Sequence, residues 1–501
     1  MALYDQYPVE VFNSLGKNKE KFEPLNPPRV GLYVCGPTVY NEAHLGNLRS
    51  FLTFDIVSRY LEHLGYNVRY VRNITDVGHL VNDADEGEDK IEKRARLEQI
   101  EPMEIVQKYT NGFHAVNKVF NLKEPSIEPT ATGHIVEQIE MVQKIISNGY
   151  GYEVNGSVYF DVQKFQEKYD YGKLSGRKVE DLLEQTRDNL TGGSEKRFFA
   201  DFAIWKGASE NTIMKWNSPW GMGVPGWHLE CSVMSTKYLG EQFDIHGGGM
   251  DLKFPHHECE IAQNIGAGGK DPVRYWMHGN MLTVNGTKMS KSLGNAFLPM
   301  ELIAGDHELL DQGFSPMTIR FFLLQAQYRS TIDFSNDALK AAEKGYKRLT
   351  NAFRLVSKME ATEGSTINSD LDSEINKLCK QLYLEMSDDF NTPKTIAILF
   401  DLGNKINSFA NDQIPLNSIS KDTFINLKVT FTTFITEVLG LEDEVEGGSG
   451  KLEDVMKMLI EMRAEARANK NWSLSDEIRD KLNAVGIVLN DGKEGSDYQI
   501  K

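Results

Sequence analysis

The hydrophobic and polar positions near the N-terminus change period twice within 50 residues. Residues 29–35 are apolar or small and rich in β-forming side chains, which predicts a buried strand. Residues 47–64 carry apolar side chains at helical spacing, and residues 67–74 predict a second strand. A strand, a helix and a strand in this order form a βαβ unit, so we expect an α/β fold with a parallel sheet. Ligands bind beyond the carboxyl ends of such strands, which is where residues 35–47 lie.

The rest of the chain divides into segments with different patterns. Between residues 118 and 222 the periodicity loosens around one short β-like run at 157–162, which indicates an inserted subdomain. A compact, glycine-rich pattern returns at residues 227–255. After residue 299 the pattern is mainly helical as far as residue 441, and Asn391 followed by Pro393 predicts a helix start.

The pattern of the last 60 residues predicts a separate small module. The composition of residues 442–450 is that of a flexible linker. A charged helix pair around residues 456–481 and a β-like run at 486–489 follow it.

Composition narrows the class of protein. A chain of 501 residues suggests three or four domains of about 150 residues each. We see no signal peptide and no apolar run of the roughly 18 residues that a membrane helix needs, so we expect no membrane partner. Four scattered cysteines favour reduced thiols in a cytoplasm, and reduced thiols can bind metal. The net charge of −17 argues against nonspecific nucleic-acid binding but allows a local basic face to bind RNA.

The first candidate motif is His44-Leu-Gly-Asn47, between the first strand and the helix. Imidazole and amide groups at a helix start can donate to phosphate oxygens, and the helix dipole adds to the attraction. Gly46 would let a nucleotide approach closely. The alternative is an ordinary turn in which Asn47 caps the helix.

The second candidate motif is Lys288-Met-Ser290-Lys291-Ser, in a loop flanked by glycines. Its two ammonium groups suit a triphosphate, because they balance the negative charge that shifts as pyrophosphate leaves. The alternative is a solvated basic loop.

A third set of residues suits a metal ion. Cys35 and Cys231 offer sulfur, and His256 and Glu260 are spaced to share one face of a helix. Two sulfurs, an imidazole and a carboxylate make a zinc ligand set. The alternative is two buried cysteines beside a histidine-rich turn. Competing ligands nearby are His228, His246, His257 and Cys259.

These motifs resemble a known enzyme family. His44 to Asn47 resembles the HIGH motif of class I aminoacyl-tRNA synthetases, and residues 288–292 match their KMSKS motif letter for letter. Within that class the chain is similar to the cysteinyl-tRNA synthetase family from about Val9 to its C-terminus. The similar runs are residues 33–40, 72–76, 225–232, 243–249, 254–258, 328–330, 333–335 and 388–393.

The resemblance implies a function and a set of site residues. The family activates L-cysteine with ATP and Mg²⁺ to cysteinyl-adenylate, and then transfers cysteine to the terminal adenosine of tRNA(Cys). The resemblance assigns one Zn²⁺ per chain to Cys35, Cys231, His256 and Glu260. It assigns Gly36, Thr75, Trp227 and Asp251 to cysteine, with Asp251 on the ammonium group and Trp227 over the side chain. It assigns His44, Gly46, Asn47, Lys288, Ser290 and Lys291 to ATP and the transition state.

Zinc would help the site to select cysteine over serine. A packing pocket separates side chains that differ by a methylene by only about 1–3 kcal/mol. Zinc prefers a thiolate to an alcohol, so a substrate sulfur bound to zinc would reject serine. This requires an expandable zinc shell or one loosely bound protein ligand, and Glu260 is our candidate for that ligand.

The resemblance also implies a domain plan and a monomer. The plan is a Rossmann-type catalytic domain (1–117 and 225–299) with a connective insertion (118–224), a stem-contact region (300–350), a helical bundle (351–441), a linker (442–450) and an anticodon-binding module (451–501). In the last module Arg463, Arg467, Lys470 and Trp472 would contact phosphate and a base, the alternative being an ordinary charged helical surface.

The chain departs from the family pattern at two places. Asn47 replaces the final histidine of HIGH, so the role of this position is open. Residues 77–80 and the acidic run 83–89 form a longer loop without an assigned role. The alternative functions are a mycothiol-type ATP-dependent cysteine ligase, against which the signature at 388–393 and the C-terminal module argue, and a noncatalytic RNA-binding paralogue.

Overall fold

The computed structural model describes residues 2–80, 88–179, 195–289, 293–361, 367–444, 449–468, 471–484, 487–492 and 495–500. The chain separates into two units, Met1–Glu442 and Asp443–Lys501. In the part of the chain described, no helix has the length and apolar character needed to cross a membrane.

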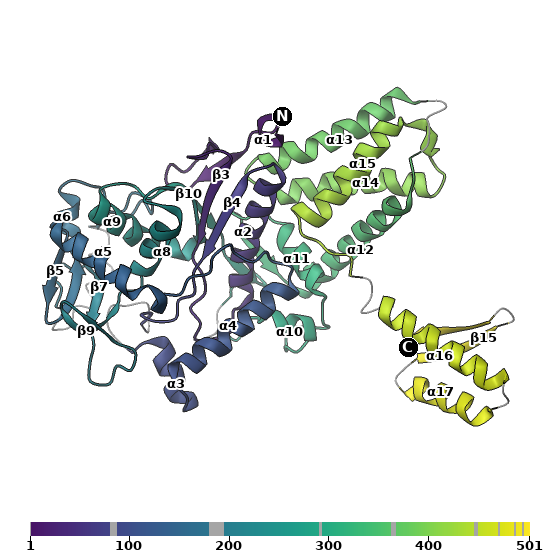
Figure 1. Ribbon diagram of the computed structural model, residues 1–501. Coiled ribbons are helices and arrows are strands. Elements are labelled where there is room, and N and C mark those ends of the chain that lie inside the picture. Colours follow the sequence, from purple (N-terminus) through teal and green to yellow (C-terminus); the bar gives the residue numbers. More distant parts are fainter. Residues whose placement is uncertain are drawn as a thin grey trace. The chain divides into compact units, whose positions relative to one another are not determined.

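The larger unit is built on a four-stranded parallel sheet, part of which is labelled in Figure 1. Its order is β11 (Val273–Gly279), β10 (Phe243–Gly249), β3 (Arg29–Val34) and β4 (Asn67–Arg72), and each neighbouring pair is parallel. The strands are apolar for most of their length because both faces of the sheet are covered. The predicted parallel sheet and its first two strands are confirmed.

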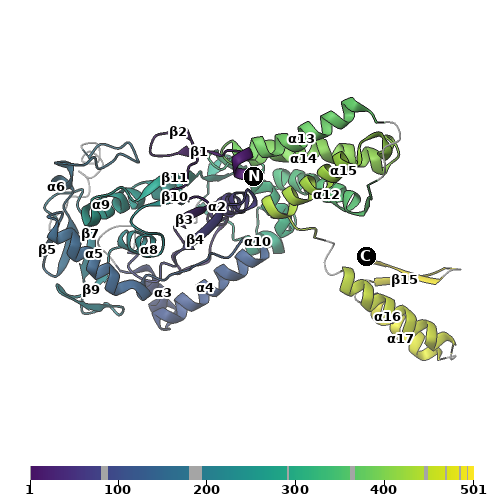
Figure 2. The same cartoon turned by 45° about the horizontal axis from the view of Figure 1, so that its top comes forward.

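Helices cover both faces of this sheet. Helix α2 (Leu45–His63) contacts β4, β10 and β11, whereas α8 (Leu229–Leu239) contacts β3 and β4. Helix α9 (His256–Gly268) packs on α8, on the side of the sheet opposite α2 (Figures 1 and 2). The predicted helix at 47–64 is confirmed and begins at Leu45.

The inserted segment forms a second sheet that the sequence predicted only in part. It is antiparallel, with the order β5, β6, β7, β9, β8, and helix α5 (Ile135–Ser147) packs beside it. Only the strand near residue 157 was expected. Strand β7 is buried along its first four residues and therefore lacks the alternation that marks a half-buried strand. The strands are β5 (Gly151–Val154), β6 (Ser157–Phe160), β7 (Phe202–Gly207), β8 (Trp216–Ser218) and β9 (Gly221–Pro225).

The region after residue 299 is mainly helical, as predicted. The predicted helix start is confirmed, because the Asn391 side chain accepts a hydrogen bond from the Lys394 N–H at 3.3 Å. The helices are α10 (Pro299–Ala304), α11 (Pro316–Leu324), α12 (Asn336–Lys358), α13 (Ser369–Ser387), α14 (Thr392–Ala410) and α15 (Lys421–Thr433), which continues as η6 (Phe434–Val438).

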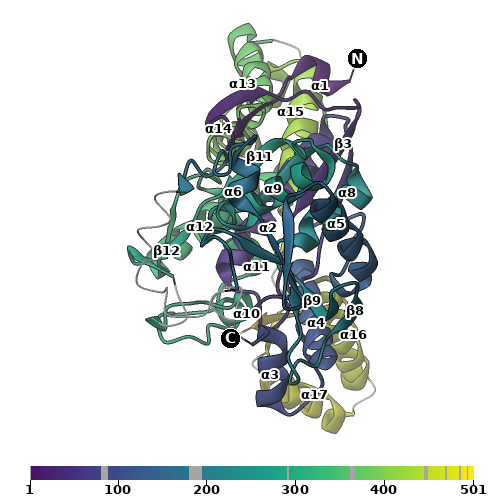
Figure 3. The same cartoon turned by 90° about the vertical axis from the view of Figure 1, so that its left-hand side faces the viewer.

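A small sheet interrupts this helical region. Strand β14 (Ile332–Phe334) pairs in parallel with β12 (Leu282–Val284), which forms a hairpin with β13 (Thr287–Lys288). Figure 3 shows β12 and α10 on the same side of the larger unit.

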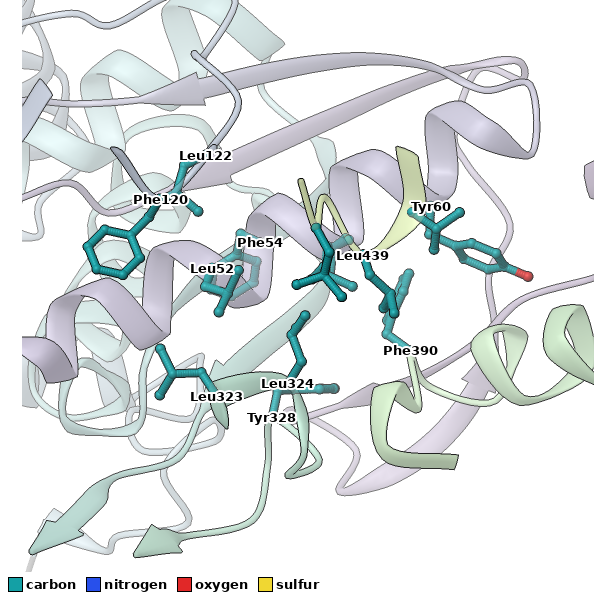
Figure 4. Close-up of a cluster of buried hydrophobic side chains, with 14 of the residues drawn as sticks. Leu52, Phe54, Tyr60, Phe120, Leu122, Leu323, Leu324, Tyr328, Phe390 and Leu439 are labelled. Carbon is teal, nitrogen blue, oxygen red and sulfur yellow. The ribbon is translucent and has the colours of Figure 1, made fainter. Parts of the chain in front are cut away.

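Helix α2 joins the sheet to the helical region through a shared apolar core (Figure 4). Buried charges add to this junction: Asp55 accepts hydrogen bonds from Arg59 Nε at 2.8 Å and from Arg320 Nη2 at 2.5 Å. A carboxylate so deeply buried requires such cationic partners. The core side chains in Figure 4 include Leu52, Phe54, Tyr60, Phe120, Leu122, Leu323, Leu324, Tyr328, Phe390 and Leu439.

The smaller unit contains the predicted helix pair, α16 (Ser449–Ala468) and α17 (Trp472–Ala484), followed by an antiparallel hairpin of β15 (Ile487–Gly492) and β16 (Gly495–Ile500). Helix α16 thus begins inside the segment expected to be a linker. The remaining elements are α1 (Leu3–Gln6), β1 (Glu10–Asn13), β2 (Asn18–Lys21), α3 (Lys90–Glu98), α4 (Pro102–Val119), η2 (Thr132–His134), α6 (Val162–Gln166), η3 (Met250–Lys253) and η5 (Leu416–Ser418).

Candidate active site and metal centre

A cavity of about 430 Å³ opens at the carboxyl ends of the parallel strands. Cys35 follows β3, Asn73 follows β4 and Gly249 ends β10, and all three line the cavity. This is the location that the βαβ pattern predicted. The predicted site residues that line it are Cys35, Gly36, His44, Asn47, Thr75, Trp227, Cys231, Asp251 and His256.

The first motif forms a reciprocal cap at the start of α2. Asn47 donates its backbone N–H to His44 Nδ1 at 3.2 Å, and the Asn47 Oδ1 accepts the backbone N–H of His44 at 3.1 Å. A Cβ on Gly46 would lie 3.0 Å from the His44 ring and 3.3 Å from Met289 Cε, so the motif leaves little space. Asn47 therefore caps the helix, and its amide NH₂ is the group that could also contact a ligand.

The second motif follows the β12–β13 hairpin. Lys288 ends the hairpin and is exposed, and the next residue, Met289, lines the cavity. Asn285 and Gly286 form the hairpin turn with φ of 49° and 75°, a conformation that suits an Asn-Gly pair. Ser290 and Lys291 lie outside the described residues.

The proposed metal ligands converge on one buried point. Cys35 Sγ lies 3.6 Å from Cys231 Sγ and 3.8 Å from Glu260 Oε1. His256 Nε2 lies 3.4 Å from Cys231 Sγ and 3.3 Å from Glu260 Oε1. These four side chains form a group that can hold a metal ion.

A second overlapping group contains two of the competing histidines, His246 and His257, with Cys35 and Glu260. In that group His246 Nε2 and Glu260 Oε2 are only 2.8 Å apart, which is the distance of a hydrogen bond. His246 is therefore a hydrogen-bond partner of the Glu260 Oε2 atom. Cys259 belongs to neither group, and its Sγ lies 3.5 Å from the Tyr171 hydroxyl.

Burial controls the charge of these groups. It raises the pKa of the Cys35 thiol well above its usual value and, as the largest influence, raises that of Cys231 to about 12. Burial likewise lowers the pKa of His257 well below its usual value and that of His278 to about 3. Burial alone therefore keeps the two thiols protonated, and a bound metal ion would favour their thiolate form.

Two family profiles match the chain. The profile described as "tRNA synthetases class I (C) catalytic domain" matches residues 21–344, and the "DALR domain" profile matches residues 382–442. A Porphyromonas gingivalis protein named "Cysteine--tRNA ligase" is 52% identical over 99% of this chain and 100% of its own length. The chain belongs to the cysteine--tRNA ligase family.

Other members of this family are similarly close. A Cytophaga hutchinsonii "Cysteine--tRNA ligase" is 57% identical over 97% of this chain and 98% of its own length. A solved Mycobacterium tuberculosis methionyl-tRNA synthetase has a TM-score of 0.59 at 14% identity, covering 85% of this chain and 93% of that one. That likeness shows a shared class I fold.

Around the candidate metal centre, the structure adds residues to those that the cysteine--tRNA ligase resemblance assigned. Asn73 accepts the Gly36 N–H at 2.9 Å, and a Cβ on Gly36 would lie 1.6 Å from the Asn73 carbonyl oxygen, so only glycine fits there. Thr75 donates to Glu230 Oε1 at 2.5 Å, and burial raises the Glu230 pKa well above its usual value. Asp251 lies at the exposed rim.

The two added residues, Glu230 and Asn73, had a sequence signal. Glu230 stands beside Cys231 in the run 225–232, and Asn73 stands in the run 72–76 beside the predicted Thr75. Their roles required distances that spacing alone does not give. His79 and Lys90, which also line the cavity, lie on either side of the acidic segment, of which residues 83–87 are outside the described residues.

Proposed function

We propose that this chain attaches L-cysteine to tRNA(Cys) in two steps, and that the described cavity holds cysteine and ATP during the first. Relatives named "Cysteine--tRNA ligase" with half identical residues along their full length support the reaction. The cavity at the strand ends, with both a candidate metal centre and the start of α2 in its wall, supports the location.

We propose that Cys35, Cys231, His256 and Glu260 hold a zinc ion. Zinc bonds of about 2.3 Å to sulfur and 2.0–2.1 Å to nitrogen or oxygen, in a tetrahedron, separate the ligand atoms by about 3.3–3.8 Å. The distances from 3.3 to 3.8 Å within this group fall in that range. When bound, zinc would favour a substrate thiolate over the serine hydroxyl.

Outside the ligand set, neighbouring side chains orient the ligands. His228 Nδ1 lies 2.9 Å from His256 Nδ1, and the His256 Nε2 faces Cys231 and Glu260. His246 bonds the second oxygen of Glu260. Because Glu260 has this alternative partner, we keep it as the ligand that binds most loosely. X-ray absorption at the zinc edge measures the number of sulfur atoms bound to zinc. If that number stayed the same when cysteine binds, the result would contradict this proposal.

We propose that the start of α2 and the second motif bind ATP with Mg²⁺. The N-terminal end of α2 attracts anions, and His44, Gly46 and Asn47 line or border the cavity there. Lys288 and Lys291 would balance the phosphate charge, and Ser290 would donate a hydrogen bond, as the cysteine carboxylate attacks the α-phosphate in line and pyrophosphate leaves.

We propose that cysteine lies between the metal centre and the rim of the cavity. Asp251 would pair with its ammonium group, Trp227 would cover its side chain, and Gly36 and Thr75 would border it. A hydroxyl of the terminal adenosine of tRNA then attacks the activated carbonyl. The work of these residues is positioning and charge stabilisation.

For tRNA binding we propose the smaller unit as the anticodon-binding module. We expected Arg463 to contact RNA. It is buried instead, with 5% of its surface exposed, so its guanidinium is not available to a partner at the surface. Arg467 and Trp472 are exposed, and Lys470 lies outside the described residues. A monomer in the cytoplasm remains our expectation.

A metal assay combined with activity assays tests this function. We expect one zinc per purified chain, cysteine-dependent ATP–pyrophosphate exchange and charging of tRNA(Cys). Cys231→Ser should lose both zinc and exchange, whereas Cys259→Ser, a buried cysteine outside the ligand set, should keep both. Selective charging by zinc-free protein in chelator would refute the zinc proposal. Transfer of cysteine to an aminoglycoside instead of tRNA would favour the mycothiol-type alternative, and the absence of both reactions a noncatalytic paralogue.

A further inference from the structure

His79, in the loop for which the sequence offered no role, is part of the cavity wall. Its Nε2 lies 2.7 Å from Lys90 Nζ, and its Nδ1 lies 2.7 Å from Thr38 Oγ1. A lysine ammonium can only donate, so His79 Nε2 accepts from Lys90 and Nδ1 carries the ring proton. The imidazole is therefore neutral, fixed in one tautomer and held at both nitrogens.

The backbone fixes this loop as well. Gly78 has φ of 82°, and its N–H donates to Asp89 Oδ2 at 2.9 Å. The His79 carbonyl accepts the Lys90 N–H at 3.0 Å, and Asp89 caps α3, the helix that Lys90 begins. A Cβ on Gly78 would lie 2.6 Å from the Pro225 carbonyl oxygen, two residues before Trp227. The backbone bonds of this loop thus fix the position of His79 beside the segment that contains Trp227.

The His79 ring stacks on Trp227. Their centroids are 3.9 Å apart with an interplanar angle of 11°. Trp227 also contacts the ring of His256, at 4.7 Å between centroids and 39°. The indole is therefore packed against a fixed imidazole and a proposed metal ligand, and it keeps an edge on the cavity.

We propose that His79 is a positioning residue for cysteine selection: it holds the Trp227 indole against His256, so that the pocket for the amino-acid side chain has a fixed wall. Lys90 and Thr38 hold His79 in turn. The inference rests on the proposed function, in which Trp227 borders the cysteine. It assigns a task to the loop at residues 77–80, where the chain departs from the family pattern.

Steady-state exchange kinetics of full-length variants test the inference. We expect His79→Ala to raise KM for cysteine about fivefold to tenfold, as the loss of one aromatic stack implies. KM for ATP should stay within about twofold, since the nucleotide motifs are unchanged. His79→Phe retains a ring over Trp227 and should recover most of the cysteine affinity. His114→Ala, an exposed histidine outside the cavity, is the matched control.

Two readouts separate positioning from general damage. Zinc content of His79→Ala should equal that of the control, and its tryptophan fluorescence response to cysteine should shrink toward that of Trp227→Phe. Should His79→Ala fold poorly, Lys90→Met removes the donor and leaves the ring in place, with a smaller rise in KM for cysteine expected.

The outcomes distinguish this inference from the proposed function. In one outcome, Trp227→Ala raises KM for cysteine, but His79→Ala changes neither this KM nor the fluorescence response. That outcome overturns the role of His79 and leaves the proposed function intact. An unchanged KM in Trp227→Ala overturns the placement of cysteine beside the indole, and the role of His79 with it.

Discussion

Asn47 shows how one residue can combine a structural and a chemical task. Its carbonyl oxygen closes the cap of α2 by accepting the His44 N–H, so the side chain is held in one orientation at the mouth of the cavity. The amide nitrogen then remains as an uncharged donor where the HIGH motif has an imidazole. The start of α2 stays ordered without a histidine at this position.

Replacing Asn47 by aspartate separates these tasks. Asn47→Asp keeps the acceptor, so we expect the free energy of unfolding to stay within about 0.5 kcal/mol of the parent, whereas Asn47→Ala should lower it by about 1 kcal/mol. The aspartate loses the donor and adds a negative charge near ATP, so the exchange rate should fall at least about tenfold. Urea unfolding and pyrophosphate exchange measure the two effects. Full exchange activity in Asn47→Asp would show that the amide does not contact the nucleotide.

The proposed metal ligands show what residue spacing can and cannot predict. The separation of His256 and Glu260 by one helical turn was visible in the sequence, and the structure places both on α9. His257 is equally close in the chain, and its Nε2 lies 3.2 Å from Cys35 Sγ. Our choice of His256 rests on its distances to Cys231 and Glu260, because several buried histidines share this region.

At the scale of elements, the turn between α13 and α14 holds the helical region to the catalytic region. The signature at 388–393 suggested tRNA binding, but Asp389 is fully buried with φ of 60°. Its carboxylate accepts hydrogen bonds from the Phe12 N–H at 2.8 Å, the Tyr328 hydroxyl at 2.7 Å and Arg329 Nε at 2.7 Å. This residue joins its own turn to two other segments and does not reach the surface.

The loop that contains Tyr328 and Arg329 also contacts helix α2. Arg49 of α2 donates to the carbonyl oxygen of Ser330, in this loop, and to that of Met281, which precedes β12. Thr283 and Gly286 of the β12–β13 hairpin both donate to the Asp333 carboxylate. The hairpin that leads into the lysine motif is therefore bonded to the loop that Asp389 holds.

Asp389→Asn tests this junction. The amide replaces an acceptor that faces four donors, the fourth being Gln327 Nε2, so we expect a loss of about 2–4 kcal/mol in the free energy of unfolding. The neighbouring Asp388 forms a surface ion pair with Lys19, and Asp388→Asn should cost less than about 1 kcal/mol. Urea denaturation followed by circular dichroism compares the two variants, and equal losses would contradict a special role for the buried carboxylate.

The helices were easier to predict than the insert's sheet. Residues 47–64 and 391–393 carry spacing and capping signals that act within one turn. Strands β7, β8 and β9 are short, glycine-containing or buried, and the pairing of β7 with β6 joins residues far apart in the chain, as in Val158 opposite Trp205. Such pairing has no local periodicity to reveal it.

At the scale of the whole molecule, the chain forms two compact units. The larger unit contains the cavity and both profile matches, and the smaller unit begins at Asp443. The sequence predicted this division from the composition of residues 442–450 and the change of pattern after them. The net charge of −17 gave no sign of an RNA partner, because charge summed over the chain hides local faces.

Trp472 tests the task proposed for the smaller unit. It is exposed, with 58% of its surface accessible, and stacking of a base on it would contribute about 1–3 kcal/mol. Trp472→Ala should therefore raise KM for tRNA about tenfold in charging while exchange stays unchanged. Met458→Ala, an exposed apolar residue of the same unit, is the control. A normal KM for tRNA would remove Trp472 from the RNA-binding surface.

The position of the proposed metal ligands along the chain has a consequence for protein synthesis. Glu260 follows Cys35 by 225 residues, and the inserted sheet lies between them. At about 5–20 residues per second, a ribosome needs roughly 11–45 s to complete this proposed set after Cys35. The Cys35 thiol would wait that long without its last partner, so metal loading would finish only after α9 has been translated.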